Sequence, residues 1–213
     1  MRKLILKMSV SVDGFVGGPN GEIDWLLKSM DDESAKWTSD TIWQAGVHIM
    51  GSRTFHDMMA YWPYTTEPFA APMNEIPKIA FSKKGIKPGD EALTTMALRD
   101  AKLLQGNKQA PAADAVLAEW AKTPILTGDL RDEIIRLKQQ PGKDIIAHGG
   151  ASFAQSLVKT GLIDEYRLLV HPVALGTGLP LFSALEKPLY LQLIDTVAFK
   201  GGAVAHVYRS TEK

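Results

Sequence analysis

The segment 145–155 constrains the fold most, because a short apolar strand leads directly into a diglycine turn and a helix. Gly149–Gly150 lets the chain turn sharply and lets another group approach the backbone closely. Ser152 and Gln155 have the spacing of a capping box, which predicts that Ser152 caps the helix. Amides at such a helix start favour an anion, so the turn predicts a phosphate cradle. A plain strand-to-helix turn has the same pattern.

The composition indicates an ordinary globular protein with a single domain spanning residues 1–213. Hydrophobic residues make up 45% of the chain and charged residues 23%. Basic and acidic residues number 24 each, so no net positive field attracts nucleic acid or a membrane surface, and neither partner is expected. The absence of cysteine excludes disulfides and thiolate sites and fits a reducing cytoplasm. The apolar run at the N-terminus is interrupted by Lys7, is too short for a signal peptide, and predicts the first strand.

Strand patterns alternate with helical patterns along most of the chain, and an antiparallel pair closes it. Strands are predicted at 4–12, 47–50, 78–82, 124–127, 145–148 and 164–173, with a hairpin of 190–199 and 203–209. Helices are predicted at 31–45, from 52 to about 59, and after Asp129 as the cap. The segment from about 85 to 118 is interpreted as an inserted helical excursion or loop. The order predicts an α/β fold with a mainly parallel sheet and an antiparallel C-terminal hairpin.

Three strand ends carry groups that suit a ligand with several phosphates. The segments are 51–54, 82–84 and 149–152, and they offer glycine amides, hydroxyls and cations. Ligands of open α/β sheets bind outside the carboxyl ends of the strands, so the three ends together predict a dinucleotide site. The competing interpretation is that Arg53, Lys83 and Lys84 are solvated surface charges.

Other chemistries find no support in the motifs. The five histidines show no metal-ligand spacing, so no metal site is predicted, and neither a hydrolase elbow, a P-loop nor a Rossmann fingerprint is present. Asp13 precedes a glycine and is interpreted first as a turn residue and second as a proton donor. Trp25 and Trp62 suit either stacking on a flat substrate or the core, whereas Trp37 and Trp43 are predicted to be core residues.

A series of ordered motifs gives the chain a family resemblance. They are residues 11–21 (SVDGFVGGPNG), 50–55 (MGSRTF), 61–63 (YWP), 128–130, 137–138, 141–145, 148–150 (HGG), 162–165 and 172–182 (PVALGTGLPLF). The chain resembles the dihydrofolate reductase-like family, specifically the riboflavin-pathway reductase branch, which includes the C-terminal domain of the bifunctional deaminase-reductase.

This resemblance implies a dihydrofolate reductase-like three-layer fold and an NADPH-dependent oxidoreductase without metal or covalent intermediate. The implied substrate is a small heterocyclic compound, pyrimidine- or pterin-like, or a carbonyl compound, as in 5-amino-6-(5-phosphoribosylamino)uracil reductase. The alternative is a non-catalytic nucleotide-binding or ligand-sensing protein on the same fold. The family also implies a homodimer, for which the apolar C-terminal hairpin offers a surface.

The resemblance further implies roles for individual residues. Ser9, Val16 and Gly17 would lie at the nicotinamide, Gly51, Ser52, Arg53, Thr54, Ser82 and Lys83 at the adenosine phosphates, and Gly149, Gly150, Ala151 and Ser152 at the pyrophosphate. Asp13, Asp40 and Trp62 are the catalytic candidates. Ser52 stands where family members usually carry arginine, so the preference for NADPH over NADH stays open.

Overall fold

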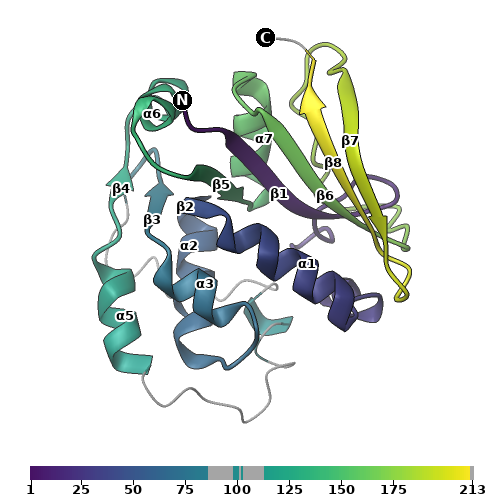
Figure 1. The fold of residues 1–213 in the computed structure, drawn as a ribbon, viewed down its shortest axis with the longest axis horizontal. Coiled ribbons are helices and arrows are strands. Elements are labelled where there is room, and N and C mark those ends of the chain that lie inside the picture. Colours follow the sequence, from purple (N-terminus) through teal and green to yellow (C-terminus); the bar gives the residue numbers. More distant parts are fainter. Residues whose placement is uncertain (86–97, 101, 103–112, 212–213) are drawn as a thin grey trace.

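The sheet has eight strands, and all but the last strand of the chain run in the same direction (Figure 1). The computed structural model describes residues 1–85, 98–100, 102 and 113–211. The strands are β1 (Leu4–Ser11), β2 (Ala45–Gly51), β3 (Lys78–Phe81), β4 (Ile125–Leu126), β5 (Asp144–His148), β6 (Glu165–His171), β7 (Leu191–Ala198) and β8 (Val204–Ser210). Their order is β4-β3-β2-β5-β1-β6-β8-β7, and β8 pairs antiparallel with both β6 and β7. The predicted fold class is therefore confirmed.

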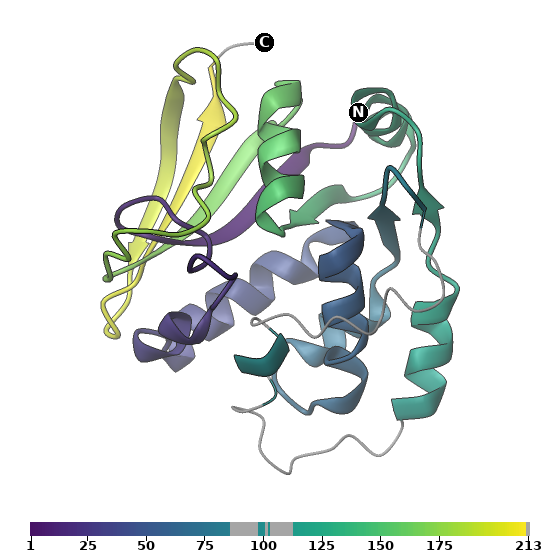
Figure 2. The same cartoon turned by 180° about the vertical axis from the view of Figure 1, so that it is seen from behind.

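Helices cover both faces of this sheet. They are α1 (Asp32–Trp43), α2 (Ser52–Met59), α3 (Ala70–Glu75), α5 (Ala113–Ala121), α6 (Leu130–Gln139) and α7 (Ala151–Thr160), with short 3-10 turns at η1 (Asp24–Lys28) and η2 (Trp62–Tyr64). Figure 1 shows α1 in front of the sheet, and Figure 2 shows α7 in front when the molecule is seen from behind.

The alternation of side chains along β1 separates the two layers. Leu4 and Leu6 pack in one apolar cluster with Ile134 of α6 and Leu157 of α7. Ile5 points to the other face and packs in a separate cluster. The next residue on that second face is Lys7, so a cation lies where the alternation calls for an apolar side chain.

Helix boundaries follow local capping chemistry, and one of the predicted caps is wrong. Asp129 accepts hydrogen bonds from the amides of Arg131 at 2.9 Å and Asp132 at 3.2 Å, as predicted for the start of α6. The predicted capping box of Ser152 and Gln155 does not form, because Gly150 is the N-cap of α7 and the helix begins two residues earlier than predicted. Gln155 instead donates to the Pro180 carbonyl at 2.7 Å.

The tryptophan predictions meet different outcomes. Trp37 packs against Phe199 as a core residue would. Trp43 does not, since it is 41% exposed as the last residue of α1. Part of the predicted insertion at 85–118 is helical, because α5 begins at Ala113. Trp120, near the end of this helix, is fully buried and donates to Asn74 Oδ1 at 2.8 Å. Residues 86–97, 101 and 103–112 of that segment lie outside the described residues.

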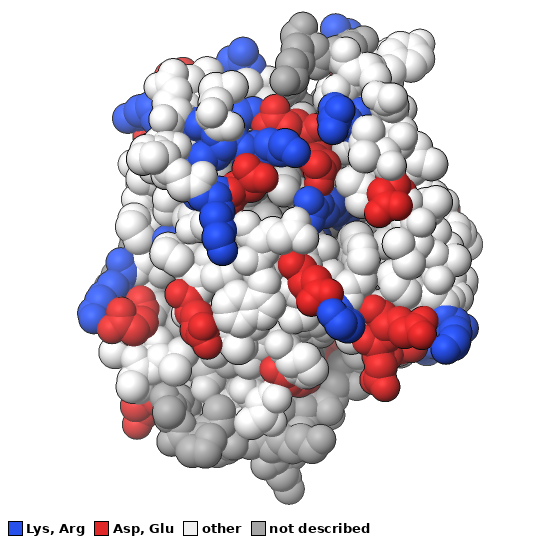
Figure 3. Space-filling model, viewed as in Figure 1, with Lys and Arg blue, Asp and Glu red and all other residues white. Residues whose placement is uncertain are grey.

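Two structural facts bear on partners. Among the described residues, no helix combines the length and apolarity needed to cross a bilayer. Figure 3 shows positive and negative side chains interspersed on the viewed face, in keeping with the zero net charge of the sequence.

Candidate active site

The three predicted strand ends lie at the same edge of the sheet, because β3, β2 and β5 are adjacent and parallel. A Cβ added to Gly51 would lie only 3.0 Å from the Phe153 Cβ, and one added to Gly150 only 3.0 Å from Thr54 Oγ1. The rings of Phe153 and Phe81 are 5.3 Å apart. The turns after β2 and β5 are therefore in direct contact, with the end of β3 beside them.

The starts of α2 and α7 keep their backbone amides free of side-chain caps. Gly51 and Gly150 are the N-caps, and neither helix has a side-chain hydrogen bond at its first turn. Two helix N-termini without a carboxylate or hydroxyl cap suit an external anion, such as a phosphate group.

Cations flank this anion-compatible edge. Arg53 and Lys83 are exposed, and neither forms an ion pair with any residue that the structure describes. Ser82 contributes less than expected, because its hydroxyl donates to the Gly85 carbonyl at 2.6 Å and closes its own turn. The remaining predicted phosphate residues, Ser52, Thr54, Ala151 and Ser152, lie in the two helix starts.

The predicted nicotinamide segment is tied down by backbone pairing. The Val16 amide donates to the Leu179 carbonyl at 2.8 Å, and the Leu179 amide donates to the Gly17 carbonyl at 2.9 Å. The Val16 amide is thus already occupied, whereas the Gly17 carbonyl keeps a second lone pair that can accept from a carboxamide. Ser9 lies on β1, where the neighbouring Met8 packs against the diglycine turn, since a Cβ on Gly149 would lie 3.0 Å from Met8 Cε.

The contacts of Asp40 and Asp13 favour structural roles, whereas Trp62 stays a prediction. Asp40 is exposed and pairs with Lys36 at 2.6 Å on the outer side of α1. Trp62 packs its ring edge-on against Tyr61 and Phe69. The Asp13 carboxylate accepts from the Ser11 hydroxyl at 2.5 Å and from the amides of Leu175 and Gly176.

Asp13 therefore links the turn after β1 to the loop at 175–176 through hydrogen bonds. The Ser11 hydroxyl and the Gly176 amide lower the pKa of Asp13 below its ordinary value, so it is ionised at neutral pH and holds no proton to donate.

We expect Asp13→Asn to lower the melting temperature at pH 7 and to leave cofactor affinity unchanged. The folded-state pKa lies below the unfolded one, so the stabilisation is present at neutral pH and lost on acidification through the folded pKa. Melting curves from pH 7 down to acid should hence converge for the wild type and the variant. A difference in melting temperature that stays constant at all pH values would contradict this structural role of Asp13.

A buried polar cluster that the sequence prediction missed lies on the α1 side of the sheet. His48 Nε2 is 3.2 Å from the Pro72 carbonyl, which can only accept, so Nε2 carries the His48 proton. His48 Nδ1 must then accept from His148 Nε2 at 2.9 Å. Burial lowers the pKa of His48 to about 4 and that of His148 well below its ordinary value, so both rings are neutral.

Lys7 is the charged member of this cluster. It pairs in register with His148, and its charge lowers the pKa of both His148 and the buried His171, so it lies near both rings. Its ammonium has no hydrogen-bond or ion-pair partner within the described ranges, and burial lowers its pKa to about 8. His171 Nδ1 lies 2.8 Å from Ser29 Oγ, whereas its Nε2 is buried without a described partner.

A sequence signal for this cluster existed. Lys7 breaks an apolar strand, and His148 ends one directly before the diglycine. Lys7 is only partly exposed and burial lowers its pKa, and a lysine withdrawn from water without a described partner is rare in a merely structural position. Lys7 is therefore a functional candidate. Metal binding has no such support: the described part of the chain holds no group of three metal-ligating side chains.

Comparisons with known proteins place the chain in a family. A model of the family described as RibD C-terminal domain matches residues 2–205. The uncharacterised protein YyaP of Bacillus subtilis (strain 168) is 30% identical over 207 residues, covering 97% of this chain and 94% of YyaP.

Two solved structures share the fold. The putative riboflavin biosynthesis protein of Shewanella sp. PV-4 superposes with a TM-score of 0.70 at 20% identity, covering 100% of both chains. Dihydrofolate reductase of Enterococcus faecalis, solved with NADP(H), gives a TM-score of 0.57 at 12% identity, covering 99% of this chain and 97% of the other. At these identities the likeness establishes the fold alone.

Proposed function

The chain belongs to the RibD C-terminal domain family, and on this premise we propose that it is an NADPH-dependent reductase. Its substrate would be a small heterocyclic compound, pyrimidine- or pterin-like, or a carbonyl compound. The observation that carries the proposal is the direct contact between two helix starts without side-chain caps, at Gly51 and Gly150. Arg53 and Lys83 lie beside them and form no ion pair with a described residue. We expect the reaction to occur in the cytoplasm.

The residues at this edge fit a dinucleotide. The amides of 51–54 and 149–152 would hold the phosphates, and the absence of a Cβ at Gly150 lets Thr54 lie directly against that turn, which brings the two helix starts together. Arg53 and Lys83 supply the positive charge that would favour an additional phosphate on the adenosine ribose, and hence NADPH over NADH.

When bound, NADPH supplies hydride to an electrophilic carbon of the substrate. On the protein side, we assign the main chemical role to Lys7, a charged group without a described partner on the α1 face of β1. Its ammonium would stabilise negative charge that develops on a substrate atom and would donate a proton there. The neutral His48–His148 pair lies beside Lys7, since His148 is its register partner on the neighbouring strand.

The test combines cofactor binding with turnover. The purified protein is titrated with NADPH and NADH, and reduced-nicotinamide absorbance is followed with 5-amino-6-(5-phosphoribosylamino)uracil, 7,8-dihydrofolate and cyclohexenone. Saturable NADPH binding with substrate-dependent oxidation supports the reductase. Tight binding without turnover supports the non-catalytic nucleotide-binding alternative, and no saturable binding contradicts both.

We propose that the protein forms a homodimer and that the two copies pair through β7. This strand ends the sheet, and exposed apolar side chains lie along it: Leu193 (50% exposed), Ile194 (43%) and Val197 (36%). A sheet edge with apolar side chains is prone to pair with another chain, which makes a second copy its natural cover.

We expect the double variant Leu193→Asp/Val197→Asp to be a monomer at concentrations where the wild type is a dimer, since two charges would be buried unpaired in the interface. Light scattering after size exclusion gives the mass. Leu27→Asp, at an exposed apolar residue of η1, is the control and should remain dimeric. A wild type that is monomeric at high concentration would contradict the proposal.

A further inference from the structure

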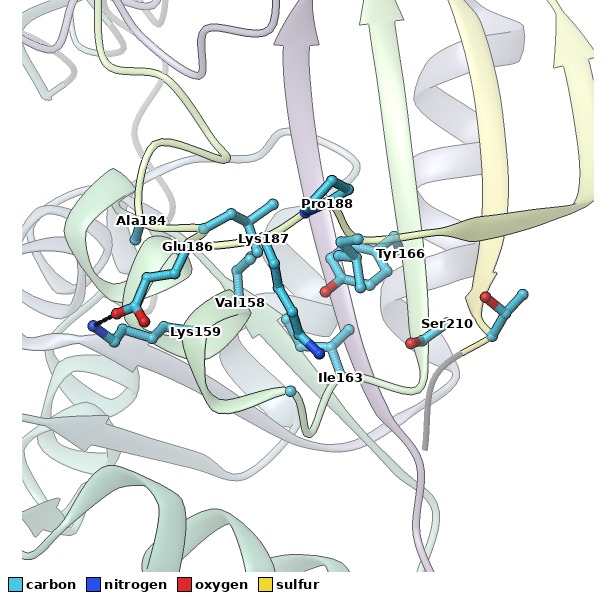
Figure 4. A pocket seen from close by; sticks show the side chains of 13 residues that line it. Val158, Lys159, Ile163, Tyr166, Ala184, Glu186, Lys187, Pro188 and Ser210 are labelled. Atoms are coloured by element: carbon cyan, nitrogen blue, oxygen red, sulfur yellow. Dashed lines mark hydrogen bonds and ion pairs between the residues drawn. The ribbon is translucent and has the colours of Figure 1, made fainter.

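A cavity of about 920 Å³ lies at the end of α7 opposite to the diglycine turn (Figure 4). Its walls come from the last turn of α7, the beginning of β6, the end of β8 and the segment 184–189. A volume of this size holds a small organic molecule. The candidate active site is at the carboxyl ends of the strands, so the cavity is separate from it.

The cavity is mainly apolar inside and carries charge at its rim. Val158, Ile163, Leu185 and Leu189 provide aliphatic walls. At the rim, Lys159 and Glu186 pair with each other at 2.6 Å, and both side chains are largely exposed. Because these two charges neutralise each other, they give no strong preference for a charged ligand.

One polar group in this wall has an unmet hydrogen-bonding capacity. Tyr166 is only 2% exposed, yet its hydroxyl makes no hydrogen bond with any described residue. Burial alone raises its pKa above the ordinary value, so the phenol keeps its proton. Figure 4 shows the hydroxyl on the side of the ring that faces Lys187 across the cavity. Its oxygen is not one of the fully enclosed polar atoms that lack a partner in the described part of the chain, so it is open to the cavity, where a ligand oxygen can accept its hydrogen bond.

We propose that this cavity is a second ligand site, which binds a small, uncharged, mainly apolar molecule that carries one oxygen acceptor. The aliphatic walls hold the apolar body, and the oxygen accepts a hydrogen bond from the Tyr166 hydroxyl. Neutrality follows from the phenol, which stays protonated, and from the rim, where Lys159 and Glu186 are already paired. Lys187, the third charged residue of the lining, is engaged in an interaction of its own. This site does not depend on the proposed reductase activity.

Phenol and toluene test the site, because they differ mainly in the oxygen. Calorimetric titration should show saturable binding of phenol to the wild type. Tyr166→Phe should weaken phenol binding roughly five-fold, the effect of one neutral hydrogen bond, and leave toluene binding unchanged. Tyr208→Phe, whose hydroxyl pairs with His206, is the matched control and should change neither affinity.

The folded state of the variants is checked by melting curves. Since the Tyr166 hydroxyl has no described partner, Tyr166→Phe should melt at or above the wild-type temperature. Leu189→Trp, which narrows the cavity, provides a second test and should weaken binding of both probes. The proposal is overturned if neither probe binds the wild type saturably, if Tyr166→Phe affects both probes alike or neither, or if Leu189→Trp leaves binding intact.

Discussion

Replacing Lys7 by Met is expected to lower turnover at least about a hundred-fold and, at the same time, to raise the melting temperature at pH 7. Turnover falls because the variant lacks the charged proton donor. Stability rises because an unpaired ammonium is held in a partly buried position that lowers its pKa to about 8. The measurements are steady-state rates with the best substrate of the panel, NADPH titration, and melting curves; NADPH affinity should not change.

The matched control is Lys78, whose pKa burial also lowers to about 8. Lys78 donates to the carbonyls of Asn74 at 2.9 Å and Ile76 at 2.8 Å and lies over the Trp120 ring. Lys78→Met should therefore lower the melting temperature and leave turnover unchanged. If Lys7→Met also lost stability and kept its rate, Lys7 would be a structural residue.

The assignment of Lys7 as the proton donor also predicts how the rate and the stability depend on pH. Lys7 is protonated below its pKa of about 8, so the rate should fall as the pH rises through this value. For stability the sign is opposite: the unfolded lysine still holds its proton between about 8 and 10.5, so the wild type gains stability relative to Lys7→Met over that interval. A rate that stays constant up to pH 10 would exclude Lys7 as the proton donor.

Reversing the charge of Arg53 is expected to weaken NADPH binding between about ten- and hundred-fold, because a charge-assisted hydrogen bond to phosphate is replaced by repulsion. Arg53→Glu is measured by titration with NADPH and NADH. The loss should be larger for NADPH if Arg53 contacts the additional phosphate, and it should shrink at high salt.

Lys36→Glu controls for net charge, since Lys36 is exposed and pairs only with Asp40 on the outer side of α1. Equal weakening of NADPH binding in the two variants would mean that general electrostatics accounts for the effect. Unchanged NADPH affinity in Arg53→Glu would remove the guanidinium from the cofactor site.

Most of the fold could be predicted from the sequence because its signals are local. Alternating apolar residues, turn glycines and the cap at Asp129 gave the strand and helix order, and the sheet topology agrees with it. The cap at Ser152 could not be predicted correctly, because Gln155 is drawn to the Pro180 carbonyl, 25 residues further along the chain. Tertiary contacts of this kind leave no local trace.

The candidate site likewise has a part that could be predicted from the sequence and a part that could not. The phosphate-compatible turns are strand ends, and parallel strands bring their carboxyl ends to one edge, so their proximity could be predicted. The histidine pair depends on the registers of β2 and β5, which place His48 and His148 on one face across 100 residues of sequence. The position of Asp40 depended on the rotation of α1 about its axis, which the sequence pattern left undetermined.

The central place of β1 has a consequence for how the chain is made. Its two neighbours, β5 and β6, are formed by residues 144–148 and 165–171. A nascent chain emerging from the ribosome therefore carries its apolar first strand without a partner until most of the polypeptide has been synthesised. Completion of the sheet is thereby deferred to a late stage of translation, and ribosome-bound fragments that stop before residue 144 should need chaperones to stay dispersed.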